Sequence, residues 1–584
     1  MDYMKKYEAW ASDHRFDEKT KAELASLIDN PVEIKERFHK DLEFGTGGLR
    51  GIMGAGTNRI NTYTVRKAAQ GFANYLNNIE CLQKELGVLI AYDSRNFSKQ
   101  FATEAALVMC ANGIKAYVFE SLRPTPELSF GIRHLGLLGG VAVTASHNPP
   151  EYNGFKVYGH DGGQVTNPAD RLIIEEVNKI DDWTKIKTVD LETAEKDGML
   201  IFVGKEIDVA YYEAILGESV DNSWIPEQGA SLNIVFTPLY GSGNMSVREV
   251  LSRAGFNNVH VVKEQEEPDG DFPTVDAPNP EDPKVFDLAL VLADKVKADI
   301  IIGTDPDADR IGVVAVNKFG KYIFLNGNMT GVLLTEYILS ARKQRGRLPK
   351  DGVIISSVVS TNLTRKISEH YGMKYKEVLT GFKYFGEKIT QMENEKKATF
   401  LFGFEETYGY LAGTYARDKD ATLTAYLVCE MAAAYKARGM TLCDGLDEIY
   451  GKYGYHLEKT KSVTLKGIEG SILMKKVMES YRTEPPKYLG TDKVIKAIDF
   501  KAGLSTDLVS GQTEETTLPK SNVVYYQAEN GSWMCIRPSG TEPKMKMYFG
   551  TEAETFCECQ EKLETITKEA LASFEDRKKR YEQN

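Results

Sequence analysis

The stretch I-I-I-G-T-D-P-D-A-D-R, from Ile300 to Arg310, joins a short apolar run to a loop that is crowded with carboxylates. Three consecutive isoleucines followed by a glycine are typical of a buried β-strand. Buried strands that alternate with amphipathic helices build α/β proteins, and these proteins usually place their sites in the loops that follow the strands. The stretch therefore predicts both the fold class and the position of a functional loop.

The same alternation continues along most of the 584 residues. Apolar residues at three-to-four spacing predict helices over 98–112, 328–342 and 421–438. Short apolar runs predict strands over 88–92, 140–144, 232–236, 300–303 and 353–357. The pattern indicates repeated α/β units with mostly buried sheets.

The length of the chain exceeds what one hydrophobic core supports and suggests about four domains. The first forty residues predict a charged helical extension, and residues 482–522 are rich in Thr, Lys, Pro, Gly and Asp. A strand pair over 522–526 and 533–537 then precedes a charged helix from about residue 552. We expect an extension and a first α/β domain over 1–210, α/β domains over 211–325 and 326–455, and a smaller α+β domain over 456–584.

The amino-acid composition limits the kinds of molecule that the protein is expected to bind and the compartment in which it is expected to work. The net charge of −12 argues against nucleic-acid or anionic-membrane binding, because both need clustered Lys and Arg. It leaves room for a small anionic substrate held by a local group of arginines and backbone N–H groups. Seven thinly spread cysteines favour a reduced, cytoplasmic protein. The first residues lack the apolar core of a signal peptide, and no run approaches the ~18 apolar residues of a membrane span.

The loop after 300–303 carries Asp305, Asp307 and Asp309 at alternate positions. Carboxylates at this spacing repel one another unless a cation lies among them, and oxygen-only ligands suit a hard ion such as Mg²⁺. An EF-hand is excluded, because Arg310 stands at its glycine position and Val316 at its glutamate position. The loop predicts a metal site in preference to a solvated acidic turn.

A second polar loop, T-A-S-H-N-P-P over 144–150, follows the predicted strand 140–144. Its two prolines stop a helix or a ladder from continuing, so Ser146 is expected to lie exposed on a stiff loop beside His147. Lys156 follows on the next extended segment. The G-x-S-x-G turn of hydrolases is absent. Taken alone, the loop is compatible with a reactive serine and with an ordinary polar turn.

Two further loops carry groups that suit a phosphorylated sugar. The stretch G-F-E-E-T-Y-G-Y over 403–410 offers hydrogen-bonding groups for sugar hydroxyls. The stretch R-P-S-G-T-E-P-K over 537–544 combines an arginine, two hydroxyls and a flexible glycine between prolines, which suits a phosphate grip. It lacks the Walker A spacing. The candidate residues are Glu405, Glu406, Thr407, Arg537, Ser539, Gly540 and Thr541.

One reaction uses all four loops, namely the transfer of a phosphoryl group between a serine and a sugar phosphate. A phosphatase with an aspartyl nucleophile is an alternative, since D-P-D over 305–307 follows a strand, but it gives Ser146 no task. A non-catalytic sugar-phosphate sensor is a third possibility. It would not need a nucleophile and a metal loop together.

These motifs resemble those of the α-D-phosphohexomutase family, which includes phosphoglucomutases and phosphomannomutases. The family's serine, metal, sugar and phosphate loops appear as T-A-S-H-N-P, D-P-D-A-D-R, G-F-E-E-T-Y-G and R-P-S-G-T, and its opening signature as F-G-T-G-G-L-R-G over 44–51. The resemblance implies an α/β fold with four domains around a central cleft. Three would be related α/β domains with mixed sheets, and the fourth a C-terminal α+β domain.

The resemblance also implies a reaction. Glucose 1-phosphate and glucose 6-phosphate would interconvert through a phosphorylated Ser146 and a glucose 1,6-bisphosphate intermediate, with Mg²⁺ as cofactor. The sugar loop carries Phe404 and Thr407 where the best-known glucose-specific form has glycine and serine. The pair is closer to the branch that contains enzymes active on glucose and on pentose phosphates. Mannose and pentose phosphates stay open as substrates, and monomer and dimer stay open as assemblies.

Roles for individual residues follow from the same resemblance. Ser146 and the three aspartates would hold the metal, with the serine contributing a phosphoryl oxygen. Arg50 and His147 would hold the serine's phosphate, and Lys156 or His147 would take the hydroxyl proton. The expected substrate-binding residues are Arg310, Lys383, Glu405, Glu406, Thr407, Lys419, Arg537, Ser539, Gly540 and Thr541.

Overall fold

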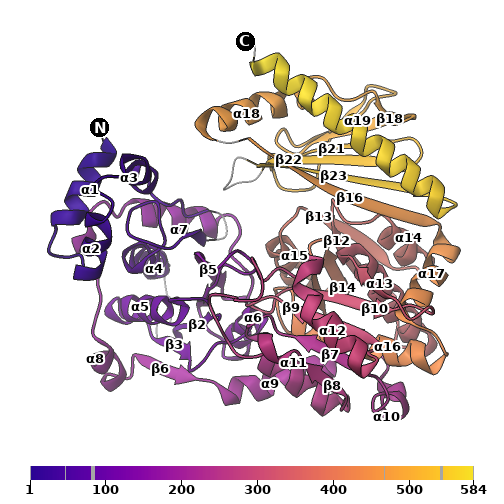
Figure 1. Ribbon diagram of the computed structural model, residues 1–584, viewed down its shortest axis with the longest axis horizontal. Coiled ribbons are helices and arrows are strands. Elements are labelled where there is room, and N and C mark those ends of the chain that lie inside the picture. Colours follow the sequence, from indigo (N-terminus) through magenta and orange to yellow (C-terminus); the bar gives the residue numbers. More distant parts are fainter. Residues whose placement is uncertain (1, 46–47, 80–85, 466, 539–543, 583–584) are drawn as a thin grey trace. The chain divides into compact units, whose positions relative to one another are not determined.

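The computed structural model describes residues 2–45, 48–79, 86–465, 467–538 and 544–582 (Figure 1). Its contacts divide the chain into two compact units, and each is described by itself. The first unit comprises Met1–Gly327, Ala341–Gly352 and Phe382–Cys443, and the second comprises Asn328–Ser340, Val353–Gly381 and Asp444–Asn584.

The first unit begins with three short helices around an aromatic cluster. They are α1 (Asp2–Ser12), α2 (Glu18–Ala25) and α3 (Pro31–Phe38). Trp10 stacks on Phe16 with ring centroids 4.2 Å apart, and Phe38 meets Trp10 edge to face. Pro31 at the start of α3 and the side-chain cap from Asn30 show why that helix begins there. The expected helical extension is present.

A six-stranded mixed sheet follows in the order β1-β5-β4-β2-β3-β6. Strands β4, β2, β3 and β6 pair in parallel, whereas β1 and β5 join one edge in antiparallel register. The bounds are β1 Gly48–Ile52, β2 Val88–Tyr92, β3 Ala116–Phe119, β4 Gly139–Val143, β5 Tyr152–Gly159 and β6 Leu200–Val203.

Helices bury this sheet. Phe72, Ile90, Val141 and Phe155 belong to one buried cluster, which explains why the central strands read as continuous apolar runs. A capping box between Asn61 and Thr64 starts α4. The helices of this part are α4 Thr62–Asn77, α5 Ser98–Ala111, α6 Thr125–His134, α7 Ala169–Asn178, α8 Leu191–Lys196 and α9 Lys205–Gly217.

A five-stranded mixed sheet comes next, in the order β11-β10-β9-β7-β8. β9 is its central strand and is buried along its whole length. β9 pairs in parallel with β7 and in antiparallel register with β10, so the aspartate loop turns tightly between β9 and β10. The bounds are β7 Ile234–Thr237, β8 Val259–Val261, β9 Ile300–Thr304, β10 Ile311–Val316 and β11 Tyr322–Leu325.

Helices α10 (Ile225–Gln228), α11 (Gly243–Ala254) and α12 (Asp287–Val296) accompany the second sheet. The same unit holds α15 (Phe382–Glu395), the antiparallel hairpin of β14 (Thr399–Glu405) and β15 (Gly409–Ala412), and α16 (Ala421–Ala437). α16 is buried over nearly all its length and packs against α11.

The second unit contains β12 (Gly352–Ser357) paired in parallel with β13 (Lys374–Val378), together with α14 (Leu363–His370). α13 (Gly327–Gln344) and α17 (Leu442–Tyr453) run across the boundaries between the units.

An antiparallel sheet dominates the rest of this unit, in the order β16-β23-β22-β21-β18-β19-β20, with β17 paired to β18. Its strands are β16 Tyr455–Thr464, β17 Tyr488–Leu489, β18 Asp492–Asp499, β19 Leu504–Asp507, β20 Thr513–Glu515, β21 Val524–Ala528, β22 Trp533–Pro538 and β23 Lys544–Ala553. α19 (Phe556–Glu582) packs along β16 and β23 and against α18 (Gly467–Thr483) (Figure 1). The expected sheet-rich C-terminal part with a charged closing helix is therefore present.

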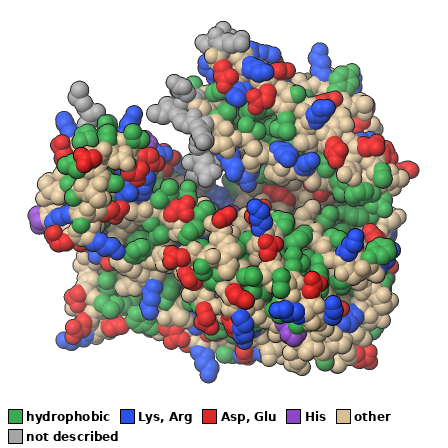
Figure 2. Space-filling view, viewed as in Figure 1, with side chains coloured by type: hydrophobic (Ala, Val, Ile, Leu, Met, Phe, Trp, Pro, Cys, Tyr) green, Lys and Arg blue, Asp and Glu red, His purple; other side chains and the backbone are tan. Residues whose placement is uncertain are grey.

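The predicted strands and helices are all found, with ends within two residues of the prediction, except that the closing helix begins at Phe556 and not near residue 552. None of the described helices combines the length and the apolar character that crossing a lipid bilayer requires. On the face shown in Figure 2, acidic and basic side chains are interspersed.

Candidate active site

Ser146 lies in the loop between β4 and β5 and adopts a left-handed backbone conformation, with φ of 52°. A non-glycine residue pays about 1–3 kcal/mol for such a conformation, so the surrounding contacts must hold it. The Ser146 N–H donates to Thr144 Oγ1 at 2.7 Å. The serine is 3% exposed, which corrects the expectation that it lies exposed on its loop.

The buried side chain of Arg95 binds four backbone carbonyl oxygens of the serine loop. Its Nη2 donates to the carbonyl oxygens of Ser146, at 2.6 Å, and Asn148. Its Nη1 donates to the carbonyl oxygens of Pro149, at 2.8 Å, and Tyr152, at 3.0 Å. A planar guanidinium with a fixed fork of donors suits this task, because one rigid group fixes four points of the loop at once.

Arg95 is held from two sides. Asp93 Oδ1 accepts the Arg95 N–H at 3.0 Å and the Ser98 hydroxyl at 2.7 Å, and the Phe272 ring lies 5.1 Å from the guanidinium carbon. Burial raises the pKa of Asp93, and the nearby Arg95 partly offsets it. Sequence reasoning missed Arg95. The available signal was a polar D-S-R run at the carboxyl end of a buried parallel strand, β2.

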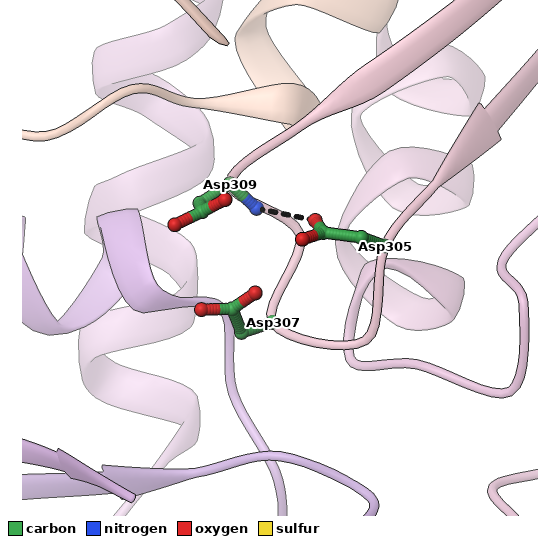
Figure 3. A group of neighbouring side chains, drawn as sticks. All are labelled: Asp305, Asp307 and Asp309. Carbon is green, nitrogen blue, oxygen red and sulfur yellow. Dashed lines mark hydrogen bonds between the residues drawn. The ribbon is translucent and has the colours of Figure 1, made fainter. Parts of the chain in front are cut away.

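The three aspartates stand together as predicted (Figure 3). Asp305, Asp307 and Asp309 are all buried, and each offers a carboxylate oxygen within 4.8 Å of the others. Ala308 takes a positive φ of 50° within the turn. Figure 3 shows the three carboxylates around a common space.

Asp305 connects this loop to the serine. Its Oδ1 accepts the backbone N–H groups of Asp309, at 3.1 Å, and Arg310, at 3.0 Å. The Ser146 hydroxyl donates to Asp305 Oδ2 at 2.7 Å. A loop of the first sheet and a loop of the second sheet thus meet at one hydrogen bond, which brings the candidate nucleophile to the carboxylate group.

Asp307 and Asp309 are held by cations and a hydroxyl. Asp307 Oδ2 accepts from Lys156 Nζ and from Thr125 Oγ1, both at 2.9 Å. Asp309 Oδ2 accepts from Lys419 Nζ at 2.5 Å, and Lys156 Nζ lies 3.5 Å from the same oxygen. Lys156 lies on β5, the extended segment that was expected. Sequence reasoning missed Thr125.

The residues present fit a divalent cation. Within the described part of the chain, Asp307 Oδ1 and Asp309 Oδ1 are buried without a hydrogen-bond partner. Arg310 Nε lies 3.8 Å from Asp309 Oδ1, too far for a hydrogen bond. A buried carboxylate oxygen without a hydrogen bond is costly, and a bound cation would remove that cost. The available donors are carboxylate oxygens and the Ser146 hydroxyl, a set of oxygen ligands that suits Mg²⁺.

Burial and the close spacing of the charged groups shift the pKa values of the aspartates and of Lys419. Burial raises the pKa of Asp305 well above its usual range, and the charges of Asp307 and Asp309 raise it further. Burial acts on Asp307 too, but Lys156 and Lys419 outweigh it and hold the pKa of Asp307 low. Burial alone would lower the pKa of Lys419, yet Asp309 and its neighbour Asp418 raise it. The surrounding charges therefore stabilise Asp307 and Lys419 in their charged forms, whereas burial and its neighbours disfavour the charged form of Asp305.

His147 Nδ1 lies 3.3 Å from the Ser146 hydroxyl. Burial, together with the cations of Arg310 and Arg50, lowers the pKa of His147 well below its ordinary value, so its imidazole is neutral at pH 7. Arg50 lies on β1, and its Nη1 donates to the Asn148 side chain at 3.2 Å. The opening signature is thereby joined to the serine loop.

Arg310 is fixed by a residue that the sequence did not single out. Its Nη1 donates to Glu281 Oε1 at 2.7 Å. Burial would lower the pKa of Arg310, but Glu281 and the aspartates Asp309 and Asp305 raise it, and Glu405 adds to the effect. Arg310 is therefore a permanent cation between the metal loop and the sugar loop.

The sugar loop joins β14 to β15. Glu405, the last residue of β14, is buried and pairs across the turn with Gly409. Glu406 and Thr407 form the turn, and Tyr408 takes a positive φ of 65°. The Tyr408 carbonyl accepts the N–H of Ile311 at 3.1 Å, so this turn is attached to the strand that follows the aspartates. The structure thus places the sugar loop beside the metal loop.

The other expected substrate-binding residues lie elsewhere or outside the described chain. Lys383, on α15, has its ammonium 3.8 Å from Asp170 Oδ2, and burial lowers its pKa. Arg537 is half-buried on β22, opposite Lys546 of β23 in the second unit. Ser539, Gly540 and Thr541 lie outside the described residues.

Comparison with protein-family models gives three successive matches. Domains I, II and III of phosphoglucomutase/phosphomannomutase, each an alpha/beta/alpha domain, match residues 41–183, 210–318 and 326–453. The chain belongs to this family. It is therefore an isomerase of the intramolecular phosphotransferase class, and the α/β fold class expected from the sequence is confirmed.

Individual relatives agree with this membership. The chain is 38% identical over 524 residues to a phosphoglucomutase of Staphylococcus epidermidis, covering 90% of this chain and 93% of that protein. It is 36% identical over 537 residues to a phosphoglucomutase of Staphylococcus aureus, covering 92% and 94%.

Two solved structures share the fold at lower identity. Parafusin (phosphoglucomutase) from Paramecium, in its open form, has a TM-score of 0.67 and 17% identity, covering 92% of this chain and 95% of that one. A phosphoglucomutase/phosphomannomutase family protein from Burkholderia thailandensis has a TM-score of 0.64 and 18% identity, covering 91% and 97%.

The contacts of Arg95 generate a prediction about the serine loop. Arg95→Lys keeps the charge but replaces the guanidinium fork by a single nitrogen, which cannot reach all four carbonyls. Each charge-assisted hydrogen bond contributes about 1.5–3 kcal/mol, so amide hydrogen exchange over residues 144–153 should accelerate about tenfold or more. Mass spectrometry of the peptide covering this loop measures the effect.

Arg248→Lys on the surface of α11, where Arg248 pairs with Glu266 at 2.6 Å, is the matched control. An unchanged rate of amide hydrogen exchange in Arg95→Lys would show that the Arg95 guanidinium does not hold the loop.

Proposed function

We propose that the chain interconverts glucose 1-phosphate and glucose 6-phosphate through a phosphorylated Ser146 and a glucose 1,6-bisphosphate intermediate. One observation carries the proposal. The hydroxyl of Ser146 lies 2.7 Å from an oxygen of Asp305, inside a buried group of aspartates in which Asp307 Oδ1 and Asp309 Oδ1 accept no hydrogen bond from the described residues. This contact supports a nucleophile beside a cation site, which is the arrangement that phosphoryl transfer to and from a serine requires.

The reaction begins with phosphate on the Ser146 oxygen. The 6-hydroxyl of glucose 1-phosphate attacks the phosphorus, a bond from that oxygen to phosphorus forms, and the bond to the serine oxygen breaks. Glucose 1,6-bisphosphate results. After the intermediate turns over in the site, the serine attacks the 1-phosphate and glucose 6-phosphate leaves. Mg²⁺, held by the three aspartates and the serine's phosphate, would offset the charge on the phosphoryl group during transfer.

Proton transfer falls to the residues beside the serine. Lys156 is the proposed group that takes the proton of the attacking sugar hydroxyl and returns it in the second half of the cycle. Its ammonium contacts Asp307 and lies close to Asp309, so it already shares the site with the serine. The neutral His147 would donate an N–H to the phosphate on Ser146. Arg310, whose pKa is raised by Glu281 and the aspartates, and Arg50 would offer guanidinium groups to the same phosphate.

We assign the substrate-binding roles from the functional groups that these side chains offer. Buried Glu405, with Glu406 and Thr407 in the adjoining turn, offers acceptors and a hydroxyl for the sugar ring. We propose that Arg537, Ser539, Gly540 and Thr541 hold the phosphate that does not react. Lys419 and Lys383 are proposed as further cationic contacts. The sugar has to bind in two orientations during the cycle, so these residues should contact hydroxyl and phosphate groups that occupy the same positions in both orientations.

An aspartyl-phosphatase reaction fits the site less well. Both oxygens of Asp305 already accept hydrogen bonds, from two backbone N–H groups and from the Ser146 hydroxyl. An attacking carboxylate would need one of those oxygens free. A non-catalytic sensor would have no use for a serine placed against a cation site.

Replacement of the serine tests the central assignment. Ser146→Ala should reduce conversion of glucose 1-phosphate to glucose 6-phosphate to the background rate, because no side-chain oxygen remains to carry the phosphoryl group. A coupled assay for glucose 6-phosphate, with Mg²⁺ and bisphosphate primer supplied, measures this loss. The unfolding temperature should change little, which separates chemistry from folding. Turnover close to that of the unaltered enzyme would remove Ser146 from the mechanism.

The identity of the sugar has its own test. We expect glucose 1-phosphate to be used faster than mannose 1-phosphate or ribose 1-phosphate, in line with the phosphoglucomutase relatives at 36–38% identity over most of the chain. Rates on the three sugars should be compared side by side, each with its own bisphosphate primer and saturating Mg²⁺. A higher kcat/KM for mannose or ribose 1-phosphate would assign the chain to that sugar and leave the serine chemistry intact.

A further inference from the structure

Asp307 and Asp309 each have one oxygen held by hydrogen bonds, whereas both oxygens of Asp305 accept hydrogen bonds, Oδ2 from the Ser146 hydroxyl. Asp305 Oδ1 is held by backbone N–H groups, Asp307 Oδ2 by Thr125 and Lys156, and Asp309 Oδ2 by Lys419. The opposite oxygens of Asp307 and Asp309 have no hydrogen-bond partner among the described residues. Asp307 and Asp309 would therefore each present a single oxygen to the proposed cation, while hydrogen bonds occupy the other oxygen.

Thr125 differs from the other residues that hold these carboxylates. It is the first residue of α6, which belongs to the part of the chain built around the first sheet, whereas Asp307 follows β9 of the second sheet. Its Oγ1 donates to Asp307 Oδ2 at 2.9 Å, and its backbone N–H donates to the Asp307 carbonyl at 2.9 Å. Two bonds from one residue thus fix both the main chain and the side chain of Asp307.

The hydrogen bond from Thr125 to Asp307 is protected from competing groups. Thr125 is 1% exposed and uncharged, so neither water nor a phosphate group competes for it as they would for a lysine. Lys156, the other partner of the same oxygen, has a long and flexible side chain, whereas the Thr125 hydroxyl belongs to a short β-branched one. Thr125 is therefore the partner that fixes the position of Asp307 Oδ2. The proline on each side of Thr125, at positions 124 and 126, stiffens the start of α6.

We propose that Thr125 is a positioning residue that restricts Asp307 to binding the cation through one oxygen and thereby favours Mg²⁺ over Ca²⁺. Mg²⁺ takes six ligands in strict octahedral geometry, whereas Ca²⁺ takes six to eight and commonly binds both oxygens of a carboxylate. An Asp307 that is free to rotate would offer both oxygens and suit Ca²⁺ better. The inference rests on the metal site of the proposed function.

The test compares metal affinities of Thr125→Val and Thr125→Ser in the full chain without sugar present. Valine preserves shape and removes the hydroxyl, whereas serine keeps the hydroxyl. Loss of a residue that orients a metal ligand typically weakens metal binding about 10–100-fold. Calorimetric titration with Mg²⁺ and, separately, with Ca²⁺ should show Thr125→Val binding Mg²⁺ about tenfold more weakly, with a smaller change for Ca²⁺. Thr125→Ser should retain most of the preference for Mg²⁺.

Controls separate this effect from damage to the fold. Thr103→Val, on α5, removes a hydroxyl that donates to the Lys99 carbonyl at 3.0 Å and should leave both affinities unchanged. Should Thr125→Val not fold, Thr125→Ala removes the same hydroxyl without the valine methyl groups. An unaltered ratio of Mg²⁺ to Ca²⁺ affinity in a folded variant without the hydroxyl would overturn the proposal. Because the readout is metal binding, this outcome would leave the proposed glucose phosphate activity untouched.

Discussion

The site depends on one electrostatic constraint: Asp305, Asp307 and Asp309 are buried with carboxylate oxygens within 4.8 Å of one another. Three like charges at that separation, away from water, are strongly unfavourable unless each is compensated. The protein supplies part of the compensation through Lys156, Lys419, Thr125 and backbone N–H groups. Asp307 Oδ1 and Asp309 Oδ1, which accept no hydrogen bond from the described residues, would face the proposed cation. Ser146 joins the group through its hydrogen bond to Asp305 Oδ2.

The α/β architecture brings the partners of this group together. The serine and Arg95 loops follow β4 and β2, which are parallel neighbours in the first sheet, and the aspartates follow β9 of the second sheet. The sugar loop reaches the same place because Tyr408 bonds to the strand beyond the aspartates. Ser146 is held in a costly backbone conformation by Arg95, a guanidinium bound to four carbonyls of its loop. The preorganisation of the serine is thus a property of the fold rather than of a substrate.

Much of the fold and part of the site could be predicted from the sequence. Runs such as 88–92 and 300–303 are short, apolar and followed by polar loops, so local pattern alone identifies them as buried strands. The aspartate loop was predictable because its three ligands are close in sequence. Thr125 and Glu281 were not predictable, since each acts through a partner far away in the chain; Thr125 and Asp307 are separated by 182 positions. The polar run after β2 marks Arg95 as a candidate, but its four carbonyl partners could not be predicted. No local pattern carries such a pairing. The roles of Arg537 and Lys383 stay predictions.

The most direct test of this account is the position of the phosphate on the enzyme. The purified protein should be incubated with Mg²⁺ and glucose 1,6-bisphosphate labelled in its phosphates, quenched, digested and mapped by mass spectrometry. The account predicts label on Ser146, recovered as glucose 6-phosphate and glucose 1,6-bisphosphate when unlabelled glucose 1-phosphate is added. Label on Asp305 or Asp307, or label released mainly as free phosphate, would contradict it, because the buried carboxylates would then be the reacting groups and not the frame that holds a cation against the serine.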